Sequence, residues 1–86
     1  MKLTLNVDTG EGIYQVTTNL KCIVSWERKF KKKASDLANG VAMEDLAFLA
    51  YEASKNAGVV VSPVFDDFID SLVSLDVVED VQTANP

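Results

Sequence analysis

Two segments decide the fold of this chain: Met43-Glu44-Asp45-Leu46-Ala47-Phe48-Leu49-Ala50-Tyr51-Glu52-Ala53 and, beyond Gly58, Phe65-Asp66-Asp67-Phe68-Ile69-Asp70-Ser71-Leu72. In each segment the apolar residues recur at the spacing of one helix face. The pattern predicts helices near 41–57 and 63–75, too short to be stable alone. We expect their stripes, Leu46–Ala53 and Phe65–Leu72, to form a mutual core.

The residues around these segments supply the signals that begin and end helices. Gly58 suits the position just after a helix. Ser62 as N-cap and Pro63 as the first helical residue predict where the next helix begins. The helix near 41–57 also carries Val41, Phe48 and Tyr51 opposite its predicted core stripe. This second apolar face needs a cover, either from the chain itself or from a partner.

The first third of the chain reads as a β-hairpin followed by a helix. Leu3–Val7 alternates, Asp8–Gly12 is rich in turn residues, and Ile13–Thr18 is rich in β-branched residues. We therefore predict a hairpin over 2–18. Thr18 or Asn19 would cap a helix near 20–32.

The predicted architecture is a small α+β single domain over residues 1–81, with an N-terminal hairpin and about three helices. The segment 76–81 is consistent with either a last helical turn or a strand. Residues 82–86 read as a flexible tail. The chain of 86 residues buries a thin core, so a partner or self-association would help it.

Charge is divided between the two parts of the chain. Residues 1–33 carry seven Lys or Arg and three Asp or Glu, whereas residues 34–86 carry one lysine and ten Asp or Glu. The net charge is −5. Such a molecule can pair its basic segment with its own acidic part or with a copy of itself.

The residue types argue against an enzyme. The chain has no histidine, the commonest general base and metal ligand, and Cys22 falls on an apolar helix arc. Asp66, Asp67 and Asp70 lack the spacing of a calcium loop and read as a solvated face. We expect no catalytic residue, no cofactor and no metal site.

The basic run Arg28–Lys33 is the main alternative signal. Together with Trp26 and Phe30 it could bind phosphates and stack bases. Both aromatic residues, however, lie on the predicted apolar arc, and the acidic second half would repel a polyanion. We therefore do not favour nucleic-acid binding.

A protein partner is the better prediction. Phe48 and Tyr51 are its centre, on the second face of the helix near 41–57, unless the hairpin or segment 76–81 covers them. The full predicted partner-binding set is Trp26, Phe30, Val41, Phe48, Tyr51 and Phe65. One cysteine, no secretory leader and no long apolar run favour a soluble cytosolic protein without a membrane partner.

In order, spacing and length, the segments resemble the tail assembly chaperones of long-tailed bacteriophages and prophages. The likeness is carried by the hairpin, by Val24–Phe30, by Met43–Ala53 with Gly58, and by Phe65–Leu72. It covers nearly the whole chain, although each motif alone is a weak helix-face pattern.

The resemblance implies a non-enzymatic protein that binds the tape measure protein and keeps it soluble while the tail tube assembles. It also implies residence in the host cytoplasm, absence from the mature virion, and a frameshift-extended form as a further partner. The alternatives are another tail structural or adaptor protein, or a small nucleic-acid-binding regulator that uses Arg28–Lys33.

Overall fold

Residues 3–78 of the chain are described by a computed structural model, except for the side chains of residues 37–39. The elements follow in the order β1 (Thr4–Asp8), β2 (Ile13–Thr17), α1 (Leu20–Phe30), a 3-10 helix (Ala34–Asn39), α2 (Met43–Asn56), α3 (Phe65–Ser71) and β3 (Ser74–Val78). The α+β class, the single domain and the N-terminal hairpin are confirmed.

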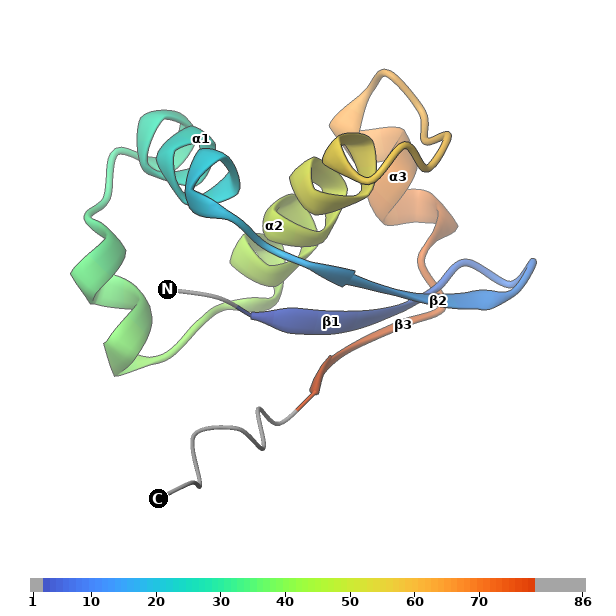
Figure 1. Ribbon diagram of the computed structural model, residues 1–86, viewed down its shortest axis with the longest axis horizontal. Helices are drawn as coiled ribbons and strands as arrows, with labels where there is room; N and C mark the ends of the chain where they lie inside the picture. Colours follow the sequence, from blue (N-terminus) through green and yellow to red (C-terminus); the bar gives the residue numbers. More distant parts are fainter. Residues whose placement is uncertain (1–2, 79–86) are drawn as a thin grey trace.

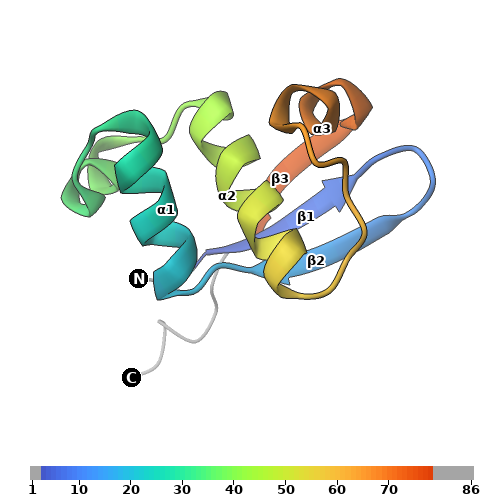
Figure 2. The same cartoon turned by 90° about the horizontal axis from the view of Figure 1, so that it is seen from above.

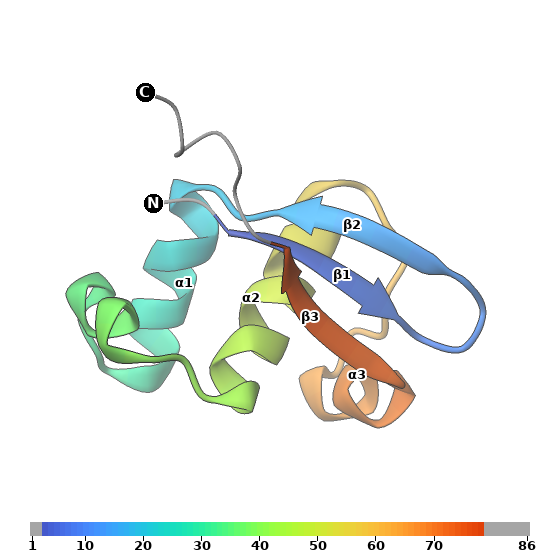
Figure 3. The same cartoon turned by 90° about the horizontal axis from the view of Figure 1, so that it is seen from below.

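The three strands form one antiparallel sheet in the order β2-β1-β3. Leu5 of β1 pairs with Val16 of β2 and with Val77 of β3. Because side chains alternate along a strand, Leu5, Val7, Val16 and Leu75 share the buried face. Thr4, Asn6 and Asp76 belong to the opposite face, which the helices leave uncovered (Figures 1 and 3).

All three α-helices lie on the same face of the sheet, with α2 between α1 and α3 (Figure 2). The α2 stripe predicted from the sequence is buried, with Leu49 and Ala50 fully inaccessible. Because its alanine side chains are small, the backbone of α2 can lie close to the elements packed against it. The core therefore lies between the sheet and α2.

Helix α1 begins and ends through identifiable contacts. Asn19 is its N-cap, and the side-chain oxygen accepts a hydrogen bond of 3.0 Å from the backbone N–H of Cys22. The helix ends at Phe30 because Lys31 adopts a left-handed conformation, with φ of 58°. The prediction of a helix near 20–32 is confirmed, apart from its last turn.

The predicted helix over 63–75 is wrong over its last four residues. Helix α3 ends at Ser71, and residues 74–78 form strand β3 against β1. The backbone N–H of Val73 donates to the carbonyl of Asp8 at 2.7 Å, which starts the pairing. The hairpin leaves one edge of β1 unpaired, and β3 satisfies it. The 76–81 segment, left open from the sequence, is strand as far as Val78; residues 79–81 and the predicted tail lie outside the described residues.

The predicted helix start at Ser62 and Pro63 is also wrong, since α3 begins at Phe65. The carbonyl of Val64, two residues after Ser62, accepts the first helical hydrogen bonds, from the backbone N–H groups of Asp67 and Phe68. The carbonyl of Ser62 accepts a 2.7 Å hydrogen bond from the hydroxyl of Tyr51, which ties the segment before α3 to α2.

Candidate functional site

The predicted outward face of α2 is not exposed. Phe48 and Tyr51 are buried, with 7% and 4% of their surface accessible. The ring of Phe48 packs edge-on against Phe30 and Phe65, with centroid distances of 5.6 Å and 5.3 Å. Tyr51 packs against Phe65 and Phe68 at 5.4 Å and 5.1 Å. The prediction that Phe48 and Tyr51 present a partner surface is wrong.

The reason is the side of α2 on which α3 sits. We expected the Phe65–Leu72 stripe to meet the Leu46–Ala53 stripe. Helix α2 instead packs against α1 and β2, and the aromatic residues of α3 contact Phe48 and Tyr51 on the face of α2 opposite that stripe. The aromatic rings that cover Phe48 and Tyr51 therefore come from α1 and α3, and not from the hairpin or β3.

The other predicted partner residues are distributed through the interior. Trp26 is 1% exposed, and its indole N–H donates a 3.0 Å hydrogen bond to the buried carboxylate of Asp45. Phe30, Val41 and Phe65 are half-buried and pack against the core. These residues therefore stabilise the fold, and the set does not form an open surface.

A single lysine covers the aromatic cluster from the solvent side. The ammonium of Lys29 lies 5.6–5.9 Å from the ring centroids of Phe30, Phe48 and Phe65. Such cation–π contacts are weak at exposed sites but hold the charged head over the rings. This arrangement further separates the aromatic residues from a partner.

An apolar groove of about 430 Å³ opens between the first turns of α2, the end of α3 and the start of β3. It is lined by Met43, Glu44, Ala47, Ile69, Leu72, Val73, Ser74 and Leu75, which we call the α2–α3–β3 groove. Met43 and Val73 are 62% and 68% exposed. The solvent-exposed surface of the groove is therefore almost entirely apolar.

The groove exists because α3 stops early. Ile69 of α3 and Leu72, the residue after α3, line the groove opposite Met43 and Ala47 of α2, and Leu75 continues the wall from β3. From α2, the groove is lined by Met43, Glu44 and Ala47. Sequence reasoning missed this site because it assigned Val73 and Leu75 to a helix. The alternation of Val73, Leu75 and Val77 was the signal of a strand.

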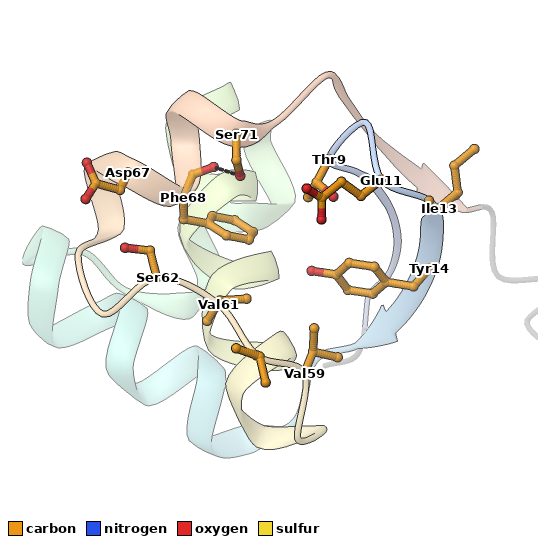
Figure 4. A pocket seen from close by; sticks show the side chains of 12 residues that line it. Thr9, Glu11, Ile13, Tyr14, Val59, Val61, Ser62, Asp67, Phe68 and Ser71 are labelled. Atoms are coloured by element: carbon orange, nitrogen blue, oxygen red, sulfur yellow. Dashed lines mark hydrogen bonds between the residues drawn. The ribbon is translucent and has the colours of Figure 1, made fainter.

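A second space of about 490 Å³ lies between the β1–β2 turn, the segment 59–62 and α3. Figure 4 shows the rings of Tyr14 and Phe68 pointing into it, while Ile13 and Asp67 point away. The hydroxyl of Tyr14 is hydrogen-bonded to Ser54 at 2.9 Å, and that of Ser71 donates to the carbonyl of Phe68. The hydroxyl groups of Tyr14 and Ser71 are therefore already engaged in hydrogen bonds that hold the fold.

The basic run is exposed at the end of α1. Arg28, Lys29 and Lys31–Lys33 all face solvent, and Lys32 lies 4.0 Å from the carboxylate of Asp45. Cys22 is buried, and its sulfur accepts a hydrogen bond from the side chain of Asn56. Within residues 3–78, no cluster of three potential metal-binding side chains occurs.

No match was found when the chain was compared with protein-family models, with curated proteins and with solved structures. Over the described part of the chain, no helix combines the length and the apolar character needed to cross a membrane. The case for a function thus rests on the residues and on the geometry described above.

Proposed function

We propose that this chain is a non-enzymatic tail assembly chaperone. It binds the tape measure protein of a long-tailed phage and keeps that protein soluble during tail tube assembly. It acts in the host cytoplasm, stays out of the mature virion, and associates with copies of itself and with a frameshift-extended form.

The observation that carries the proposal is the α2–α3–β3 groove. A chaperone for a long amphipathic helix needs an apolar surface that the monomer leaves open. Met43 and Val73 provide exposed side chains, and Ile69, Leu72 and Leu75 provide the floor. An apolar helix stripe can lie in such a groove with residues at i, i+3, i+4 and i+7 as anchors. The resemblance in element order supplies the identity of the client.

A test requires co-expression of the chain with the tape measure protein. We expect the wild-type chain to increase the soluble fraction of that protein, and the double variant Met43→Gln/Val73→Asn to lose the effect. Both substitutions are at exposed positions, so the fold should persist.

The matched control is Leu20→Gln/Val60→Asn. Leu20 is the first residue of α1 as Met43 is of α2, Val60 and Val73 both lie outside helices and strands, and both control residues are exposed. If neither the wild type nor the control raises the solubility of the tape measure protein, the proposal is wrong. Recovery of the chain from purified particles would favour a structural adaptor instead.

A further inference from the structure

We infer that the α2–α3–β3 groove binds an amphipathic helix whose apolar stripe is flanked by lysine or arginine. This inference rests on the proposed function, because it specifies the chemistry of the segment that the groove receives. It concerns charge at the edge of the site, whereas the proposed function concerns the apolar groove itself.

The first observation is the charge at the groove. Glu44 is the one ionisable residue in its lining and is exposed. On α3, Asp66 and Asp70 are exposed; Asp66 lies three residues before Ile69, which lines the groove, and Asp70 directly follows Ile69. Residues three apart on a helix are neighbours. Glu44, Asp66 and Asp70 therefore form what we call the acidic rim.

Within residues 3–78, no ion pair neutralises the acidic rim. Two ion pairs form among the described residues, Lys32 with Asp45 and Lys55 with Glu52. Neither pair uses a carboxylate of the acidic rim. The groove therefore presents apolar surface bordered by free negative charge, and a complementary ligand has apolar surface bordered by positive charge.

The same charge argues against two other occupants. A second copy placed groove to groove would bring two acidic rims together, and like charges at an interface are unfavourable. The chain's own last residues begin with Glu79 and Asp80, which the acidic rim would also repel. A separate, basic-flanked helix is the occupant that charge complementarity selects.

The probes are two synthetic helical peptides with the same leucine stripe at i, i+3, i+4 and i+7. One has lysines beside the stripe and the other has glutamates. Binding to the full chain is measured by fluorescence anisotropy over a salt series. We expect the lysine peptide to bind about tenfold more tightly than the glutamate peptide at low salt, and the difference to shrink as salt rises.

The variant that tests the acidic rim is Glu44→Gln/Asp66→Asn/Asp70→Asn. Its matched control is Glu11→Gln/Asp67→Asn/Asp76→Asn, which removes the same charge from exposed positions that do not line the groove. We expect the rim variant to lose the preference for the lysine peptide and the control to keep it.

The outcomes separate the two proposals. Equal binding of both peptides, abolished by Met43→Gln/Val73→Asn, would overturn the charge preference and leave the groove as a helix site. Equal weakening by rim and control variants would show a net-charge effect and also overturn it. If neither peptide binds, the inference is wrong. The proposed function is tested separately by co-expression with the tape measure protein.

Discussion

At the scale of single residues, the interior of this chain contains aromatic side chains that its periodicity placed on the surface. Phe48 illustrates the point, because it faces away from the alanine-rich stripe of α2 and is still buried by Phe30 and Phe65. Edge-to-face contacts of this kind add to the stabilisation that burial provides. The role of Phe48 is therefore in folding.

Replacement of Phe48 by alanine tests this role. We expect Phe48→Ala to lower the free energy of unfolding by about 3–5 kcal/mol, because it removes a buried ring and leaves a cavity. Val60→Ala, at a position that is 96% exposed, should change it by no more than about 0.5 kcal/mol. Urea unfolding measures both. A similar, small change in unfolding free energy for both variants would show that Phe48 is exposed and not part of the core.

The Trp26–Asp45 hydrogen bond is a second residue-scale prediction. Trp26→Phe removes the donor to a carboxylate that is 5% exposed, so the unfolding free energy should fall by about 1–3 kcal/mol. In an Asp45→Ala background the same substitution should cost less, because no buried acceptor is left without its donor. Strictly additive costs in this double-mutant cycle would contradict the contact.

At the scale of elements, the end of α3 and the start of β3 have the largest consequence for the site. If Leu72–Leu75 had continued as helix, β1 would have lacked its second neighbour. The observed break gives β1 a partner on each side and opens the groove between α2, α3 and β3. Strand β3 is thus both part of the sheet and a wall of the proposed site.

Two substitutions on β3 separate its contributions. Leu75 is 7% exposed and Val77 is 47% exposed, on the same face of the strand. We expect Leu75→Ala to lower the unfolding free energy by about 2–5 kcal/mol, and Val77→Ala to lower it by under about 1 kcal/mol. Chemical denaturation gives both values. If Leu75→Ala costs as little as Val77→Ala, β3 is not docked as described.

Local signals explain which elements were predictable. The hairpin, α1 and α2 follow from alternation, from helical spacing and from a cap such as Asn19, all of which act over a few residues. The start of α3 was misplaced by two residues, and the segment before it is held by the Tyr51 hydroxyl on the Ser62 carbonyl, a contact eleven residues apart in sequence that local patterns do not encode. The candidate groove was missed for the same reason, since its walls come from three separate elements.

At the scale of the whole molecule, charge separation persists in the fold. The basic run Arg28–Lys33 lies at the end of α1 and its cations are exposed, while the acidic rim borders the groove at α2 and α3. Of the aromatic residues next to the basic run, however, Trp26 is buried and Phe30 is half-buried against the core under the ammonium of Lys29, which leaves little ring surface for bases to stack on. Any affinity for nucleic acid would be purely electrostatic.

Titration with a fluorescent oligothymidylate over a salt series tests this statement. We expect weak binding at about 0.05 M salt and none at about 0.2 M, because phosphate contacts alone are lost steeply with salt. The fluorescence of Trp26 should not change on addition of the oligonucleotide, because the indole is buried. Salt-resistant binding that quenches Trp26 would revive the nucleic-acid alternative.

By itself the sequence determined the α+β class, the hairpin, the two long helices and the division of charge. Each of these follows from residue patterns that act over short stretches of the chain. Only the tertiary structure decided which face of α2 is covered by α3 and that residues 74–78 pair with β1. Both outcomes depend on contacts between distant segments, where a long-range hydrogen bond or a free strand edge outweighs local helical preference. The same contacts moved the candidate surface from Phe48 and Tyr51 to the α2–α3–β3 groove.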